Sequence, residues 1–172
     1  MAKTLIAFFS RADENYFGGA MRYVKVGNTE IAVNLMKDMI SADTFKIEMK
    51  NPYSPVYMTC IDEAKKDLRN NARPELVSLP ESIEAYDTII LGYPNYWGTM
   101  PMAVFTFLEA FDFSGKTILP FCTNEGSGMG RSERDIKNIC KAKVAKGLSI
   151  NGSRAANSGD SIKKWLKQNG LV

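Results

Sequence analysis

The chain has 172 residues, of which 45% are apolar and 24% are charged, and its formal net charge is +3. This is the composition of an ordinary globular protein, and the length suits one domain, so we expect residues 1–172 to form a single domain. The sequence contains no histidine, which excludes Ser–His and Cys–His triads and removes the most common zinc ligand.

The cysteines and the apolar runs indicate the compartment. Cys60, Cys122 and Cys140 are odd in number and far apart, which favours reduced thiols over a disulfide framework. No apolar stretch approaches the ~18 residues that span a bilayer, and the N-terminal apolar run is too short for a signal peptide. We therefore expect a cytoplasmic protein that does not enter a membrane.

Strand-like and helix-like patterns alternate along the chain. Short runs rich in β-branched and aromatic residues predict strands, and apolar residues at intervals of three and four predict helices. The predicted strands are residues 4–9, 44–49, 88–92, 116–121 and 144–150. The predicted helices are residues 29–40, 61–68, 102–111, 132–140 and 160–168.

This alternation predicts an α/β fold, a doubly wound five-stranded parallel sheet with helices on both faces. Residues 44–49 alternate between apolar and polar, which is typical of a strand at the sheet edge, and Trp165 is expected to face the core from the last helix. In such sheets ligands bind outside the carboxyl ends of the strands, where the strand order reverses. The loops after the first, third and fourth strands are therefore the candidate binding segments.

The first of these loops begins at Ser10 and ends at Gly27-Asn28-Thr29, where a helix starts. Asn28 or Thr29 can be a simple helix N-cap. Alternatively, the hydroxyl groups of Ser10 and Thr29 and the amides of the helix start suit a phosphate. Neither a nucleoside-triphosphate loop nor a dinucleotide fingerprint is present, so a monophosphate fits best.

The second loop places large aromatic side chains among residues that break strands and helices. Tyr96 and Trp97 follow Pro94-Asn95 and precede Gly98. These rings can cover the core at the sheet edge, or they can wall a flat slot for a planar heterocycle. In the second case Gly98 lets the backbone approach the edge of that ring.

The third loop, residues 123–130, has the sequence Thr-Asn-Glu-Gly-Ser-Gly-Met-Gly. It is longer than the 2–6 residues that usually connect a strand to a helix. Its backbone amides and small hydroxyl groups suit the polar edge of a ring or a sugar-like chain.

Taken together, these segments resemble the flavodoxin-like family, whose members bind flavin mononucleotide (FMN). The resemblance spans nearly the whole chain and is carried by residues 5–10 with 27–29, 92–101, 107–108, and 112–117 with 126–128. It implies non-covalent FMN as the cofactor, with no metal and no catalytic side chain. It also implies cofactor contacts from Ser10, Asn28, Thr29, Pro94, Asn95, Tyr96, Trp97, Gly98, Thr123, Asn124, Glu125, Gly126, Ser127 and Gly128.

Two features depart from the pattern of that family. Residues 11–26 are inserted between the phosphate-loop serine and Gly27, and they can form a lid over the flavin or a surface excursion. The second departure is charge: electron-carrying members of the family are typically acidic around the flavin, whereas this chain has a net charge of +3. Residues 131–172 carry 10 Lys and Arg against 3 Asp and Glu, whereas residues 1–130 carry 12 against 16. Solvated helix faces explain this basic segment better than nucleic-acid binding does, because exposed aromatic residues are not interleaved with the lysines.

The functional hypothesis is therefore an FMN-binding redox protein that transfers electrons between partners whose identity the sequence does not specify. A reductase that takes hydride from NAD(P)H and passes it to a quinone or similar acceptor is the alternative. A flavin-free binding module on the same fold is a third. The lack of histidine is compatible with both redox functions, because the reactive group belongs to the cofactor.

Overall fold

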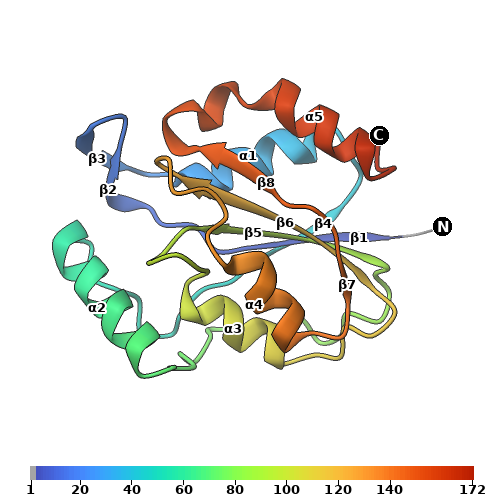
Figure 1. Ribbon diagram of the computed structural model, residues 1–172, viewed down its shortest axis with the longest axis horizontal. Coiled ribbons are helices and arrows are strands. Elements are labelled where there is room, and N and C mark those ends of the chain that lie inside the picture. Colours follow the sequence, from blue (N-terminus) through green and yellow to red (C-terminus); the bar gives the residue numbers. More distant parts are fainter. Residues whose placement is uncertain (1–2) are drawn as a thin grey trace.

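The computed structural model describes residues 3–172, whose main sheet consists of parallel strands (Figure 1). The strand order is β4-β1-β5-β6-β7, and β8 also pairs with β6. The strands are β1 (Thr4–Phe8), β4 (Asp43–Lys46), β5 (Thr88–Pro94), β6 (Thr117–Asn124), β7 (Lys143–Val144) and β8 (Leu148–Asn151). The predicted fold class is confirmed, and β4 lies at the sheet edge as its alternating sequence indicates.

The last predicted strand, 144–150, is divided into β7 and β8. Val144 is opposite Ile118, but Leu148 is opposite Phe121, so the β7–β8 segment contains one more residue than β6 between these pairs. Such an extra residue is a β-bulge. It lies beside Pro120, which has no amide hydrogen to give to a ladder and therefore favours an interruption there.

Helices cover both faces of this sheet (Figure 1). α1 (Asn28–Lys37) and α5 (Gly159–Gln168) lie on one face, and α3 (Met102–Glu109) and α4 (Ser132–Ile139) lie on the other. A short 3₁₀ helix, η1 (Gly152–Asn157), precedes α5. Among the described residues, every helix falls short of the length and apolarity that crossing a membrane requires.

The core is divided between the two faces by the alternation of side chains along β1. Ile6 and Phe8 pack on the side of α1 and α5, whereas Leu5 and Ala7 pack on the side of α3. Trp165 is 5% exposed, and its ring lies edge to face with that of Phe121. The predicted inward orientation of Trp165 is therefore confirmed.

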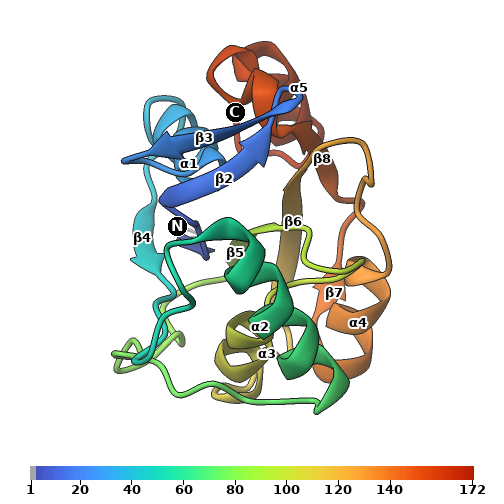
Figure 2. The ribbon, with the colours of Figure 1, turned by 90° about the vertical axis from the view of Figure 1, so that its left-hand side faces the viewer.

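Two elements stand at the carboxyl end of the sheet, above and below the strand ends in Figure 2. The inserted segment forms an antiparallel hairpin of β2 (Asp13–Phe17) and β3 (Ala20–Val24). Its turn is Gly18-Gly19, with φ of +62° and +78°, the geometry that glycine accepts most readily in a two-residue hairpin. α2 (Tyr57–Arg69) begins four residues before the predicted helix at 61–68.

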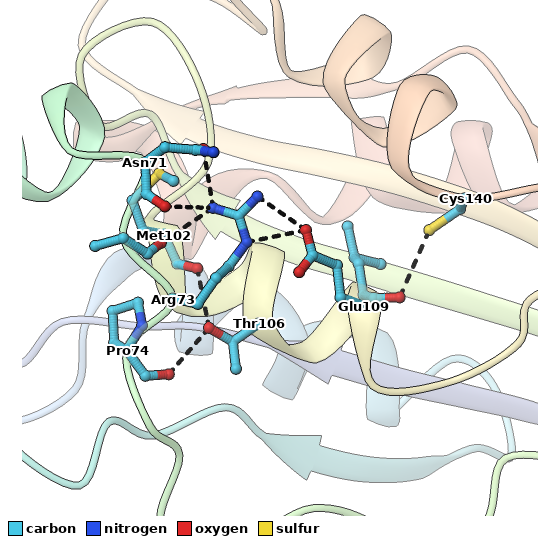
Figure 3. A network of polar contacts seen from close by, with 9 residues as sticks. Asn71, Arg73, Pro74, Met102, Thr106, Glu109 and Cys140 are labelled. Carbon is cyan, nitrogen blue, oxygen red and sulfur yellow. Dashed lines mark hydrogen bonds and ion pairs between the residues drawn. The ribbon is translucent and has the colours of Figure 1, made fainter.

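Distant parts of the chain hold both ends of α2. At its N-terminus, the amide of Tyr57 donates to Glu14 Oε1 at 2.9 Å. This carboxylate takes the place of an N-cap side chain and complements the helix dipole. Beyond its C-terminus, Arg73 lies between Asn71 and Glu109 (Figure 3), with 2.8 Å between Arg73 Nη2 and Glu109 Oε1. Thr106 Oγ1 donates to the carbonyl of Pro74 at 2.9 Å in the same network.

Replacing Arg73 by alanine should destabilise this connection between α2 and α3. Arg73 is partly buried and donates to Glu109 and to the Asn71 and Ala72 carbonyls. We expect Arg73→Ala to lower the free energy of unfolding by about 1–3 kcal/mol. Urea unfolding measures this change, with Lys66→Ala, an exposed position on α2, as the control expected within about 0.5 kcal/mol of wild type. Equal stabilities of the two variants would contradict the prediction.

Candidate functional site

Two adjoining cavities open at the carboxyl ends of β1, β5 and β6 and are lined by residues of the hairpin and of α2. The hairpin and α2 lie on opposite sides of these strand ends (Figure 2). Their volumes are about 220 and 340 Å³. Together they fall within the size range of small-molecule sites, about 300–1,000 Å³. The residues that line both are Arg11, Asn15, Tyr57, Asn95, Tyr96 and Ser127.

The N-terminus of α1 forms the polar end of the smaller cavity, which Asn28 and Thr29 line. The first amides of a helix have no partner inside it. The amide of Glu30 donates to Ser10 Oγ at 3.1 Å, and that of Ile31 donates to the Gly27 carbonyl. Within residues 3–172, the amides of Asn28 and Thr29 have no acceptor. This end of the cavity is therefore suited to an anion.

Gly27 is required by the close approach of two chain segments. A Cβ at this position would overlap the Arg11 carbonyl oxygen and Ser10 Oγ. Its φ of −70° is ordinary, so space, not backbone conformation, selects glycine here.

A buried hydrogen bond joins α1 to β6 beside the same cavity. The hydroxyl groups of Thr29 and Thr123 lie 2.8 Å apart, and the two residues are 2% and 4% exposed. One hydroxyl donates to the other, so one hydroxyl hydrogen of the pair is still available as a donor. This available donor and the amides of α1 are at the same end of the site.

The loop after β6 is shaped by Asn124. Its Oδ1 accepts the amides of Gly126 and Gly128, both at 3.0 Å, and φ is +115° and +68° at these glycines. Neither glycine lines a cavity, although Asn124, Glu125 and Ser127 do. The glycines serve the conformation of the loop, and a direct contact from either to a cofactor stays a prediction.

Glu125 connects this loop to the inserted hairpin. Its Oε1 accepts the amide of Gly18, at the hairpin tip, at 2.6 Å. A Cβ on Gly152 would come within 2.8 Å of Glu125 Oε2 and 2.7 Å of Asn28 Nδ2. The wall beyond the α1 N-terminus is therefore closely packed.

The loop after β5 contains a tight turn at residues 96–99. The amide of Tyr96 donates to the Thr99 carbonyl at 2.8 Å, and φ is +56° at Trp97 and +89° at Gly98. These angles correspond to a type I′ turn. Glycine adopts such angles freely, whereas a bulky residue such as tryptophan rarely does.

Both hydrogen-bonding groups of Gly98 are occupied within the protein. Its amide donates to Asn95 Oδ1 and its carbonyl accepts the amide of Arg131, each at 2.8 Å. A Cβ on Gly130 would overlap the Gly98 carbonyl, so glycine at 130 allows this contact. The turn is therefore held by the loop after β6.

Trp97 and Tyr96 line the larger cavity but have different environments. Trp97 is 43% exposed, its Nε1 donates to the Ile61 carbonyl of α2 at 2.8 Å, and Lys65 Nζ lies 4.8 Å from its ring centroid. The ring of Tyr96 meets that of Phe9 edge to face. Within the part of the chain that the structure describes, the Tyr96 hydroxyl is buried without a hydrogen-bond partner, and burial raises its pKa well above the ordinary value.

The cavities therefore bring together most of the residues predicted from the sequence. These are Asn28, Thr29, Pro94, Asn95, Tyr96, Trp97, Gly98, Thr123, Asn124, Glu125 and Ser127. Ser10 lies outside both and accepts the Glu30 amide instead. Direct contact between any of these predicted residues and a cofactor stays a prediction.

Sequence reasoning missed the walls that the hairpin and α2 contribute. These residues are Arg11, Asn15 and Tyr16 near or on the hairpin, Tyr57, Cys60, Ile61 and Ala64 on α2, and Gly152. The apolar face of α2 was visible in the sequence. Its position beside the strand ends was not, because it depends on Glu14 and Trp97, both distant in sequence.

A family model described as flavodoxin matches residues 20–169. A search of curated proteins found no match. Among solved structures, a candidate flavoprotein from Bacteroides uniformis ATCC 8492 is 27% identical with a TM-score of 0.75, covering 96% of this chain and 98% of the other. A candidate flavoprotein from Bacteroides eggerthii DSM 20697 is 24% identical with a TM-score of 0.75, covering 100% of both. A flavoprotein from Lactobacillus acidophilus NCFM, solved in complex with FMN, is 16% identical with a TM-score of 0.64, covering 96% and 99%.

A methyl group at position 27 should disturb the polar end of the site. We expect Gly27→Ala to lower the free energy of unfolding by about 1–3 kcal/mol, the usual cost of overpacking. In the control Gly159→Ala, the new Cβ would lie 3.8 Å from Met39 Cε, an ordinary contact. That variant should match wild type or exceed it by up to about 1 kcal/mol. Denaturant unfolding compares the two, and an unchanged Gly27→Ala would show that the segment relaxes without cost.

Proposed function

Since the chain belongs to the flavodoxin family, we propose that it is a redox protein that binds FMN non-covalently and transfers electrons through it. The observation that carries the proposal is the order of chemical groups along the joined cavities. Helix amides and hydroxyl groups lie at one end, and an apolar slot lies at the other. The proposal treats residues 1–172 as one FMN-binding domain.

The polar end fits the phosphate and the ribityl chain. The amides of Asn28 and Thr29 would donate to phosphate oxygens, with the hydroxyl pair of Thr29 and Thr123 beside them. Asn124 and Ser127 would face the ribityl hydroxyl groups. The close packing around Gly152 favours a terminal phosphate over one that carries an adenylate.

The apolar end fits the flavin ring. Cys60, Ile61 and Ala64 of α2 line it on one side, and the turn that contains Trp97 and Gly98 lines it on another. These groups would exclude water from the ring. FMN would supply the electron or hydride chemistry, while the protein positions the ring and sets its surroundings.

One observation favours the electron carrier and another favours the reductase. The larger cavity is bordered by α2 and by the hairpin residues that hold it, and these walls would restrict the approach of a dinucleotide. By contrast, the amide and the carbonyl of Gly98 both form hydrogen bonds within the protein. The turn therefore has little freedom to change its hydrogen bonds to the ring, as a carrier of single electrons would require. An NAD(P)H-dependent quinone or flavin reductase is therefore the second candidate.

The same proposal includes a cytoplasmic location. All three cysteines are buried and free, and burial raises the pKa of the Cys122 thiol to about 12 and that of Cys140 to about 11. Such thiols stay protonated and unreactive in a reducing compartment.

FMN binding is the direct test of the proposal. We expect the apo protein to take up one equivalent of FMN, with a shifted visible absorption spectrum, and to bind FAD much more weakly. Spectroscopic titration with both flavins measures this. The absence of FMN uptake would leave the flavin-free binding module as the remaining hypothesis, and preference for FAD would contradict the assignment of the polar end.

Mixing with reduced nicotinamides separates the carrier from the reductase. Hydride transfer needs the nicotinamide within about 3–3.5 Å of the ring, and α2 limits that approach. We therefore expect NADH and NADPH to bleach the bound flavin at well below about 1 s⁻¹, a typical lower value for enzyme turnover. Stopped-flow absorbance gives the rate, with dithionite as the control that the flavin is reducible. Bleaching at enzymatic rates would replace the carrier by the reductase.

A further inference from the structure

Tyr57 is an aromatic residue that lines both cavities, and it lies outside the loops predicted from the sequence. It is the first residue of α2, and its ring is half-buried. Burial raises the pKa of its hydroxyl, so the side chain is neutral at physiological pH. A neutral, partly covered ring at the junction of the cavities is suited to contact a planar ligand.

The other aromatic residues of the larger cavity are held by contacts to neighbouring groups. Tyr96 packs edge-on against Phe9, at a centroid distance of 5.9 Å and an interplanar angle of 78°. The indole of Trp97 is fixed to the Ile61 carbonyl and lies under Lys65. The loop at residues 124–130 contributes no aromatic side chain. Tyr57 is the aromatic ring that α2 contributes to both cavities, at the place where they adjoin.

The hairpin holds Tyr57 in this position. Its amide donates to Glu14 Oε1, and Arg11 Nη2 donates to the carbonyl of Pro55, two residues earlier, at 3.1 Å. The ring of Tyr16, which lines the smaller cavity, lies next to that of Tyr57, with centroids 6.4 Å apart and an interplanar angle of 31°. A ring held before the ligand arrives loses little conformational entropy on binding.

We infer that Tyr57 forms the α2 wall of the slot and stacks on the planar heteroaromatic ring of the bound ligand, with Tyr16 as its support. The inference rests on the proposed binding of FMN and adds the residue that stacks on the flavin ring. It also assigns a role to the inserted hairpin, which positions Tyr57 from the opposite side of the site.

The test compares FMN with riboflavin, which lacks the phosphate. Loss of the stacking ring should weaken both flavins by the same factor, about tenfold for a loss near 1.4 kcal/mol. Tyr57→Leu keeps an apolar side chain but removes the ring, and Tyr57→Phe keeps the ring. We expect Tyr57→Leu to show the loss and Tyr57→Phe to stay within about twofold of wild type.

Two controls identify the cause of any loss. Thr29→Val should weaken FMN far more than riboflavin, because it acts at the phosphate end. Tyr23→Ala removes an exposed tyrosine of the hairpin, 73% accessible, that lines neither cavity, and should change neither affinity. The thermal unfolding midpoint of each apo variant shows whether the protein is still folded. If Tyr57 had only a structural role, the folded Tyr57→Phe and Tyr57→Leu variants would bind flavin with the same affinity.

The outcomes are separable. If the wild-type chain binds both flavins, and Tyr57→Leu and Tyr57→Phe bind them with equal affinity, the stacking role of Tyr57 is overturned. The proposed binding of FMN then still holds. A loss confined to FMN in Tyr57→Leu also overturns it, because the contact would then be to the phosphate. Failure of the wild-type chain to bind either flavin overturns both this inference and the proposed function. Equal losses for the two flavins in Tyr57→Leu, with retention in Tyr57→Phe, support it.

Discussion

The common direction of the strands is the constraint on which the site depends. Because β1, β5 and β6 are parallel, their carboxyl ends lie at one edge of the sheet, and each following segment starts there. The start of α1, the turn at residues 96–99 and the loop after β6 are brought together by this geometry alone. The hydrogen bond between Thr29 and Thr123 then fixes the spacing of α1 from β6 at the wall of the smaller cavity.

The second half of the site is added to this frame by long-range contacts. α2 touches the inserted hairpin through Glu14 and the turn after β5 through Trp97, and the segment that follows α2 reaches α3 through Arg73. Each contact contributes little free energy by itself, but together they fix the position of the start of α2, its middle and the segment after its end. Within α2, Leu68 packs against the core on the α3 side of the sheet, whereas Cys60, Ile61 and Ala64 line the larger cavity.

The sequence was informative where a local pattern carried the signal. Strand 88–92, the apolar helix at 102–111 and the loops at their ends were predicted from neighbouring residues, and Tyr96 and Trp97 do lie at a cavity. The hairpin and its contacts were not predictable, because Gly18 meets Glu125 across 107 residues. Gly126 and Gly128 are predicted to contact the cofactor. Their hydrogen bonds to Asn124 and their positive φ angles already explain why glycine occupies these two positions in the loop.

At Trp97 a strained backbone conformation is combined with a contact that holds α2. A bulky residue with φ near +56° stores backbone strain, of the order of 1–3 kcal/mol, which glycine or asparagine at the same place would largely avoid. Glycine or asparagine at this position would relieve the strain but would remove the indole and its hydrogen bond to the Ile61 carbonyl of α2. Position 97 is therefore a place where a substitution that relaxes the backbone would weaken the native contact with α2.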